Sequence, residues 1–203
     1  MNIEFLVTAL IVCILPGTGV IYTLAVGLGR GFVPSTIAAL GCTLGIVPHA
    51  LVSIIGLAAL LQTSTIAFQT VQWLGVAYLF YMAWGILRDE SALTVSEQND
   101  PIGAYVLIRD GILLNALNPK LSLFFLAFLP QFVPPSTLHP ATTMMALAFV
   151  FMVMTFAVFV FYGACASSAR DYVISKPAVM RWLKRSFAAA FILLGVRLAL
   201  AGQ

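Results

Sequence analysis

The stretch that decides the fold is GILLNALNPKLSLFFLAFLPQFV at residues 111–133, an apolar run that is interrupted near its middle. A membrane-spanning helix needs roughly 20 predominantly apolar residues, and this run is long enough to be one. The interruption, NALNPK at residues 115–120, contains a proline, which removes a backbone donor and collides with the preceding helical turn. Backbone groups that are freed in hydrocarbon need partners in the protein or in trapped water. The break is therefore expected to face a protein-lined cavity.

The whole chain has the composition of a membrane protein. Of its 203 residues, 62% are hydrophobic and 8% are Asp, Glu, Lys or Arg, whereas a soluble domain has about 25% charged residues. These charges are too few to solvate a globule of this size. We therefore predict an all-α integral membrane protein with a single transmembrane domain over residues 1–203, which leaves no space for a soluble catalytic domain.

Six apolar stretches predict six transmembrane helices. They are separated by glycine, proline, polar or charged residues, and the shortest gap, residues 62–65, implies a tight antiparallel hairpin. The predicted helices cover residues 3–27, 37–61, 66–87, 111–133, 141–165 and 186–202.

The positions of lysine and arginine predict the orientation of these helices. Most of them lie between helices one and two, three and four, or five and six, and basic residues mark cytoplasmic connections. These residues are Arg30, Arg88, Arg109, Arg170, Lys176, Arg181, Lys184 and Arg185. Both termini are therefore expected outside the cytoplasm. With six helices, the first three and the last three then run in opposite senses, as in an inverted repeat.

A second interruption supports this 3+3 inverted repeat. The first predicted helix contains LPGTG at residues 15–19, near its middle. Helices one and four are thus both broken, and paired broken helices with polar neighbours are typical of transporter binding sites. The alternative is that each proline only kinks a packed helix, which is common in membrane bundles.

The first interruption offers backbone groups to a ligand. An unwound turn at Pro16, Gly17, Thr18 and Gly19 exposes amides and carbonyls, and its glycines let a ligand approach the backbone. The hydroxyl of Tyr22 follows along the same segment. Such a turn could hold the carboxylate or the ammonium of an α-amino acid, so these five residues are substrate-binding candidates. Glycine in a close helix contact is the alternative role.

The second interruption offers side chains. Asn115 and Asn118 are three residues apart and share a helix face, so both amides can line one cavity. Lys120 could hold a substrate carboxylate, or could pair with Asp110 if the helix is distorted. Polar groups buried without partners would be costly, so we add Asn115, Asn118, Pro119 and Lys120 to the predicted substrate-binding set.

Two residues are candidates for coupling transport to protons. Asp110 lies at the predicted cytoplasmic entrance of helix four, and its alternative role is an N-cap for the helix that begins at Gly111. His49 lies within predicted helix two, and imidazole titrates near neutral pH, although a single histidine is more often a hydrogen-bonded packing residue. We rank Asp110 first, because a carboxylate at the start of a broken helix can exchange protons with the cytoplasm.

The sequence carries no enzyme motif, no phosphate-binding glycine loop and no metal-ligand cluster, so we expect a non-enzymatic protein without metal, cofactor or nucleic-acid partner. Two other classes remain open. A divalent-cation exporter would need converging carboxylate, thiolate or imidazole ligands, and a transmembrane thiol–disulfide relay would need paired cysteines. Cys13, Cys42 and Cys165 are dispersed and lack CxxC spacing. Replacing all three should therefore leave an exporter functional.

The chain resembles the LysE/RhtB family of bacterial inner-membrane amino-acid exporters over essentially its full length. The resemblance is carried by Pro16-Gly17, by Gly27, Gly31, Gly41 and Gly45, and most specifically by Asn118-Pro119-Lys120 followed by LFFLAFLPQF at residues 123–132. Thr18-Gly19 departs from the family, in which a proline and then a polar residue usually follow Pro-Gly. The resemblance implies export of amino acids or close derivatives from the cytoplasm by proton antiport, and a homodimer is an assembly to test.

The predicted cavity favours a neutral substrate. Lys120 is the basic residue expected to reach the middle of the membrane, and no carboxylate is expected there. We therefore expect a zwitterion, either homoserine-like or branched, in preference to lysine or arginine.

Overall fold

The computed structural model describes residues 2–15, 17–60, 103–134 and 137–168, together with single residues between 73 and 84 and between 185 and 196. Within these residues every regular element is a helix, and no strand occurs. The predicted all-α fold is confirmed for this part of the chain. Predicted helices three and six, residues 66–87 and 186–202, lie outside the described residues apart from those single positions.

The first predicted helix is broken, as its sequence indicates. Helix α1 (Ile3–Ile14) and helix α2 (Thr18–Arg30) are bent by 53° relative to each other. Asn2 caps α1 by accepting a hydrogen bond from the backbone N–H of Glu4, and α2 runs on to Arg30, beyond the predicted end at residue 27. An arginine in the last turn of a helix is favourable, because it interacts with the negative end of the helix dipole.

The second predicted helix begins earlier than expected. Helix α3 (Phe32–Leu44) starts directly after Gly31, not at residue 37, and is followed by α4 (Val47–Leu60). Pro34 lies in the first turn of α3, where backbone N–H groups have no intrahelical partner, so it does not delay the helix. A continuous apolar span runs through both elements over Phe32–Gly56.

The fourth predicted helix also begins earlier, and this changes the position of its charged residues. Helix α6 (Ala104–Ala116) starts at Ala104 and is N-capped by Gly103, so Asp110 lies inside it. The alternative role of Asp110 as an N-cap at Gly111 is therefore wrong. The physical reason is that Arg109 neutralises the carboxylate of Asp110 on an exposed helix surface, where charge does not end a helix.

The break within this fourth helix is confirmed. After α6 the chain continues through α7 (Pro119–Leu123), a π-helical turn η1 (Phe124–Phe128) and a 3₁₀ turn η2 (Leu129–Phe132). The two halves, Ala104–Ala116 and Lys120–Phe132, are bent by 53°. Pro119 stands at the start of α7, where its missing N–H costs no hydrogen bond.

The fifth predicted helix is the long helix α8 (Pro140–Ser168). Large apolar side chains such as Phe149 and Phe161, each 66% exposed, lie on its outer surface. A helix that is apolar on all sides is typical of a membrane span. By length and composition, two of the described helices and the two bent pairs can cross a membrane, which supports a multi-pass membrane protein.

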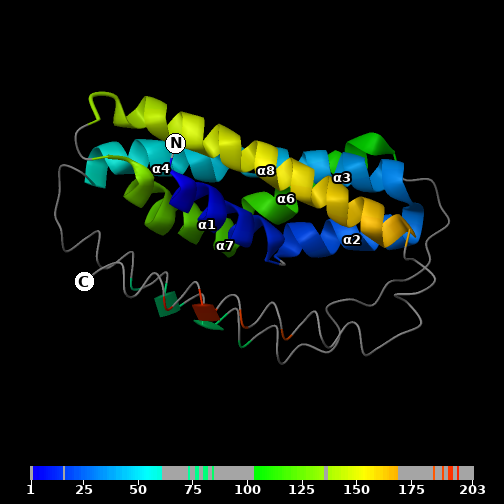
Figure 1. Ribbon diagram of the computed structural model, residues 1–203. Helices are drawn as coiled ribbons and strands as arrows, with labels where there is room; N and C mark the ends of the chain where they lie inside the picture. The colour runs from blue at the N-terminus through cyan, green and yellow to red at the C-terminus, as the bar shows by residue number, and fades with distance from the viewer. Residues whose placement is uncertain are drawn as a thin grey trace.

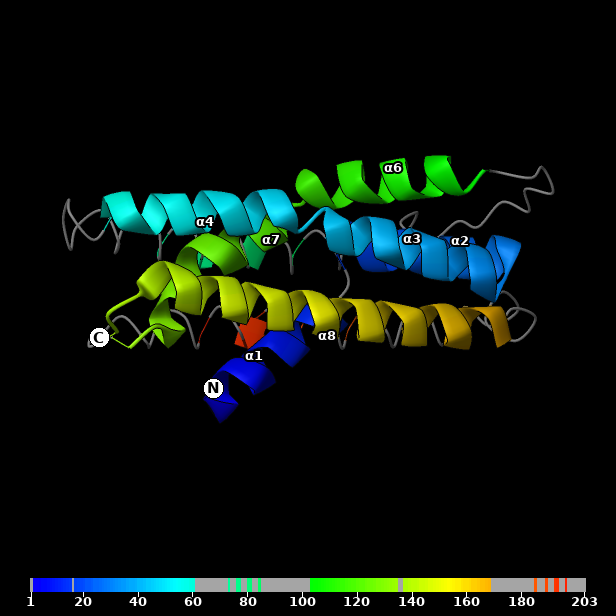
Figure 2. The ribbon, with the colours of Figure 1, turned by 90° about the horizontal axis from the view of Figure 1, so that it is seen from above.

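Helices α1 to α4 pack against α8, and α6 packs mainly against α3. Helix α8 contacts α1, α2, α3 and α4, and it runs along the length of the bundle in Figure 1. In Figure 2, α4 and α6 follow one another along the side opposite α8, and α1 points away from the line of α2. Helices α3 and α6 touch through glycines, because a Cβ on Gly41 would lie 2.5 Å from the carbonyl oxygen of Ile108. This close contact brings the break after α6 to the centre of the bundle.

Candidate functional site

The two helix breaks meet at a small cavity in the interior of the bundle. Its volume is about 10 Å³, the space of about one water molecule. Five of the residues predicted to bind substrate line it: Gly17, Gly19, Asn115, Asn118 and Lys120. The remaining lining residues are Val12, Cys13, Val20, Leu121, Phe151, Thr155 and Phe159. The cavity therefore has a polar side made by the two breaks and an apolar side to which α1, α2, α7 and α8 all contribute.

At the first break, the carbonyls that end α1 are satisfied by side chains from distant segments. A helix leaves its last carbonyls without intrahelical partners, and burial requires that they find others. The ammonium of Lys120 donates to the carbonyl oxygens of Val12, at 3.0 Å, and Leu15, at 2.8 Å. The hydroxyl of Tyr162 donates to the carbonyl oxygen of Ile14 at 2.8 Å.

At the second break, the carbonyls that end α6 are satisfied in the same way. The hydroxyl of Thr18 donates to the carbonyl oxygen of Leu114 at 3.0 Å. The Nε2 atom of His49 lies 2.8 Å from the carbonyl oxygen of Asn115. Lys120, which belongs to the second break, thus donates hydrogen bonds to carbonyls of the first break. Thr18, which belongs to the first break, donates one to a carbonyl of the second break. Each break stabilises the other.

Two asparagines connect the second break to the cavity. The side chain of Asn118 donates from Nδ2 to Oδ1 of Asn115 at 3.3 Å, so the two amides lie together although α6 ends between them at Ala116 and they do not share one helix face. Asn115 in turn donates to the carbonyl oxygen of Cys42 at 2.8 Å, and Oδ1 of Asn118 accepts from the backbone N–H of Lys120 at 3.0 Å. Both amides are buried and bonded, so the lining is held in one arrangement.

The glycines of the first break allow the two breaks to approach each other. A Cβ on Gly19 would lie 2.5 Å from Oδ1 of Asn115, and one on Gly17 would lie 2.9 Å from Nδ2 of Asn118. Real Cβ atoms do not come so close to other heavy atoms, so only glycine fits at these positions without a shift. The alternative role predicted for these glycines, a close contact between helical segments, is therefore observed.

Lys120 is 5% exposed and does not pair with Asp110. The predicted Lys120–Asp110 pair is wrong, because the break turns the lysine toward α1 while Asp110 stays on the outer surface of α6. The carboxylate of Asp110 instead accepts from Nε and Nη2 of Arg109 at 2.9 and 2.8 Å.

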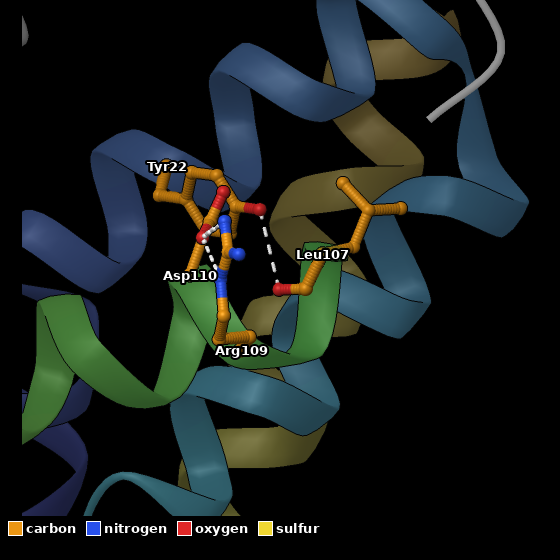
Figure 3. A network of polar contacts seen from close by, with 4 residues as sticks. All are labelled: Tyr22, Leu107, Arg109 and Asp110. Carbon is orange, nitrogen blue, oxygen red and sulfur yellow. Dashed lines mark hydrogen bonds and ion pairs between the residues drawn. The ribbon is translucent and has the colours of Figure 1, made fainter. Parts of the chain in front are cut away.

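Asp110 and Tyr22 lie together, away from the cavity (Figure 3). The side chains of Arg109 and Asp110 are 52% and 38% exposed, so water screens their interaction. The hydroxyl of Tyr22 donates to the carbonyl oxygen of Leu107 at 3.2 Å and so ties α2 to α6. The structure therefore does not place Tyr22 with the other predicted substrate-binding residues, and Pro16 lies outside the described residues.

His49 is buried at the start of α4, beside the second break. A carbonyl oxygen only accepts, so Nε2 carries the hydrogen in its bond to Asn115. The other ring nitrogen, Nδ1, lies 3.1 Å from the hydroxyl oxygen of Ser122. A hydroxyl can donate or accept, so this environment satisfies both the neutral and the protonated imidazole. The ring also stacks on Phe125, with centroids 6.5 Å apart.

Sequence reasoning missed the contribution of α8 to the site. Phe151, Thr155, Phe159 and Tyr162 are spaced by three or four residues and form one stripe on that helix. Thr155 lines the cavity and lies 3.2 Å from the thiol of Cys13. The signal that could have found it is a threonine and a tyrosine seven residues apart in the otherwise apolar middle of that helix, residues 144–166.

The described cysteines occupy separate places. The thiol of Cys42 bonds to the carbonyl oxygen of Gly19 at 3.8 Å, Cys13 faces Thr155, and Cys165 is exposed. In the described part of the chain, no group of three or more His, Cys, Asp or Glu side chains could hold a metal ion.

Fold and site together define an α-helical, multi-pass membrane protein in which two broken helices meet at a cavity that is polar on one side and apolar on the other. The chain matches the family described as LysE type translocator over residues 10–202, and it belongs to this family. The predicted family resemblance is thereby confirmed.

Three curated relatives illustrate the range of this similarity. The chain is 30% identical to an uncharacterized membrane protein of Vibrio cholerae over 98% of its own length and 96% of the relative. It is 27% identical to a homoserine/homoserine lactone efflux protein of Salmonella typhi, over 97% and 95% of the two chains. It is 29% identical to a leucine efflux protein of an Enterobacter species, over 76% of each. No solved structure matches the chain.

Proposed function

We propose that this protein is a secondary transporter that exports amino acids or close derivatives from the cytoplasm. The observation that carries the proposal is the cavity at which two broken helices meet, lined by Gly17, Asn118 and Lys120. Relatives over nearly the whole chain are named as efflux proteins for homoserine, its lactone and leucine, which supports this class of substrate.

The proposed architecture is a single transporter domain over residues 1–203, with six spans in a 3+3 inverted repeat. Two observations support it. The first and fourth helices break with the same bend of 53°, and each break supplies a side chain that satisfies the other. Transporters built from inverted repeats bind substrate between such discontinuous helices.

We place the protein in the bacterial inner membrane with both termini outside the cytoplasm. The basic residues support this orientation, since a reversed chain would put most of them on the wrong face. A Gln98→Cys variant tests it, because residue 98 lies in a predicted cytoplasmic connection. We expect no labelling by an impermeant thiol reagent applied to intact cells, and labelling from outside would contradict the orientation.

The chemistry of the cavity favours a neutral α-amino acid, either homoserine-like or branched. Helix-end carbonyls suit an ammonium group, Lys120 suits a carboxylate, and Phe151 and Phe159 offer apolar contact to a side chain. The volume of about 10 Å³ is too small for such a molecule, so the helices must separate to admit it. A cavity that opens in this way is what alternating access requires.

The proposed energy source is a proton gradient, and His49 is the better candidate for the proton carrier. It is buried, touches the carbonyl that ends α6, and has hydrogen-bond partners in both protonation states. Asp110 is exposed and paired with Arg109, away from the cavity. We therefore reverse the order expected from the sequence and keep Asp110 as the second candidate.

The other two classes have less support. The ammonium of Lys120 at the cavity would repel a metal cation, which weighs against a divalent-cation exporter. A thiol–disulfide relay would depend on Cys13, Cys42 or Cys165. A variant in which all three are replaced by serine or alanine should still transport, and loss of transport with normal insertion would favour the relay.

The proposal is tested with labelled leucine and homoserine in inside-out membrane vesicles. The cytoplasmic face points outward in these vesicles, so an exporter accumulates substrate in the lumen, and an acidic lumen should drive uptake by proton antiport. We expect uptake that depends on the protein and rises with the imposed gradient. Uptake of both amino acids no greater than in vesicles without the protein would contradict the proposed function.

A further inference from the structure

The end of α1 presents two backbone carbonyls that are already occupied by an ammonium group. The carbonyl oxygens of Val12 and Leu15 both accept from Nζ of Lys120, at 3.0 and 2.8 Å. The lysine reaches them from α7, a segment more than a hundred residues away in the sequence, and its side chain is nine-tenths buried. These carbonyls lie at the negative end of a helix, where a cation is stabilised.

The same carbonyls would fit the α-ammonium of an amino acid. A lysine Nζ and an α-ammonium are both –NH₃⁺ groups with three donors and no acceptor. The Lys120 ammonium already fills the space beside Gly17, because a Cβ on this glycine would lie 3.3 Å from Nζ of Lys120. Both groups therefore compete for one place at the edge of the cavity.

We propose that Lys120 is a tethered substitute for the substrate's ammonium, and that substrate binding exchanges their partners. The α-ammonium of the substrate takes the carbonyls of Val12 and Leu15. Lys120, released from them, binds the substrate's carboxylate. This inference rests on the proposed export of amino acids and names the groups by which the cavity recognises them.

After the exchange, every buried charged group has a partner only if the substrate carries both an ammonium and a carboxylate. A zwitterion brings one positive and one negative charge, so after the exchange the substrate ammonium has the carbonyls and Lys120 has a carboxylate. An amine without a carboxylate leaves the lysine without its partner, and a carboxylate without an amine leaves the carbonyls bare. Buried groups without partners are costly, so either compound should be a poor ligand.

The exchange also links binding to movement. Lys120 is a direct tie between α7 and the end of α1, and it joins the two halves of the site. When the ammonium of a free amino acid takes the place of Lys120 at these carbonyls, the covalently anchored link between α7 and α1 is replaced by a link through the substrate. This link is lost when the substrate dissociates. Binding would therefore loosen the contact between the two breaks, as opening of the small cavity requires.

The first test compares competitors of labelled leucine uptake into inside-out vesicles that carry the wild-type protein. Leucinol has the ammonium but no carboxylate, and N-acetyl-leucine has the carboxylate but no ammonium. We expect both to compete about tenfold or more weakly than unlabelled leucine, because each leaves one buried group without a partner. Competition by N-acetyl-leucine equal to that by leucine would overturn the ammonium site, while uptake itself would still support export.

The second test uses the Lys120→Met variant, purified and monitored by thermal unfolding with each compound. A ligand that binds the folded protein raises its melting temperature, so this readout does not depend on transport. Wild-type protein should be stabilised more by leucine than by leucinol. In the variant this preference should disappear while N-acetyl-leucine stays without effect, because the carbonyls are free and the partner of the carboxylate is gone.

A variant that still prefers leucine to leucinol would overturn the role of Lys120 in the exchange. If the variant does not insert, the wild-type competitor series decides the question alone. If wild-type vesicles take up neither leucine nor homoserine, the proposed function fails and the exchange fails with it. If only the proposed exchange is wrong, leucine uptake is still observed, but leucinol and N-acetyl-leucine compete with it as well as leucine does.

Discussion

The two helix breaks have the same bend of 53° but contribute different chemistry. The first break, between α1 and α2, contributes mainly backbone: the carbonyls of Val12 and Leu15 and the close-packed surface at Gly17 and Gly19. The second, between α6 and α7, contributes side chains, above all Asn118 and Lys120. The comparison teaches that neither break is a site by itself. A binding site for a zwitterion needs both kinds of group, and they come from opposite halves of the chain.

The largest effect is expected for the charge contributed by the second break. Lys120→Ala removes two charge-assisted hydrogen bonds and leaves the carbonyls of Val12 and Leu15 unsatisfied. We expect leucine uptake to fall about 100-fold, which corresponds to about 2.7 kcal/mol. The measurement is vesicle uptake at equal amounts of inserted protein, judged by immunoblot. Uptake within a factor of about two of wild type would show that the lysine only packs the break.

The close contact at the first break should be almost as sensitive. Gly19→Ala introduces a Cβ that would lie 2.5 Å from Oδ1 of Asn115 and 2.9 Å from the ring of Phe159. Because overpacking of this kind costs about 1–3 kcal/mol, we expect a lower melting temperature and about tenfold slower uptake. Gly56→Ala is the matched control, since a Cβ at that position would meet none of the described residues within 4 Å. Equal melting temperatures and equal uptake rates of the Gly19→Ala and Gly56→Ala variants would contradict the close packing of the two breaks.

Coupling to protons sharpens the comparison further, because His49 bonds to residues of the second break, Asn115 and Ser122. His49→Gln should lose gradient-driven accumulation but keep exchange of labelled for unlabelled leucine, since glutamine cannot carry a proton. In wild type, one unit of pH gradient can support about tenfold accumulation, because one unit corresponds to about 1.36 kcal/mol. His139→Gln, at an exposed position, is the control. Undiminished accumulation by His49→Gln would remove His49 from the proton step.

A smaller effect on uptake is expected for the hydroxyl of Thr18, which belongs to the first break and bonds to a carbonyl of the second break. Thr18→Val removes the hydrogen bond to the carbonyl oxygen of Leu114, and a single neutral bond contributes about 1 kcal/mol. We expect uptake to fall about fivefold. Thr143→Val is the control, because this exposed threonine also donates to a backbone carbonyl but lies far from the breaks in sequence. Equal uptake by the two variants would mean that Thr18 does not hold the second break.

The smallest effect is expected at Asp110. Asp110→Asn breaks an exposed ion pair with Arg109, and such pairs contribute about 0–1 kcal/mol. We expect gradient-driven uptake close to that of wild type. Loss of accumulation with retained exchange would instead assign the proton step to Asp110 and leave His49 as a structural residue.

The sequence predicts the all-α fold and both breaks because proline, glycine and asparagine interrupt apolar runs that are otherwise continuous. It places Asn115 and Asn118 on one helix face, and their side chains do bond to each other, although α6 ends at Ala116 and Asn118 is the extended N-cap of α7. It does not predict the starts of α3 and α6. Pro34 suggests a later start for α3, yet proline is tolerated in the first turn of a helix. The Arg109–Asp110 pair suggests a later start for α6, yet a neutralised charge is tolerated on the exposed surface of a helix.

The partners of Lys120 could not be predicted for a different reason. A 53° bend redirects α7 toward α1, so the lysine reaches Val12 and Leu15 instead of a residue on its own helix. Spacing along one helix says nothing about such contacts. The same holds for Thr155 and Tyr162, whose role depends on how α8 packs against α1.

The central claim is that the two breaks form one substrate site, and Asn118→Ala tests it most directly. Asn118 starts α7 and joins Asn115 to the cavity, whereas Asn2, the exposed N-cap of α1, is a matched asparagine outside it. The measurement is uptake of labelled leucine and homoserine into inside-out vesicles with an acidic lumen, at equal amounts of inserted protein. We predict normal uptake by Asn2→Ala and uptake about 100-fold below wild type by Asn118→Ala, as for Lys120→Ala. Wild-type uptake by Asn118→Ala would show that the break is only a kink.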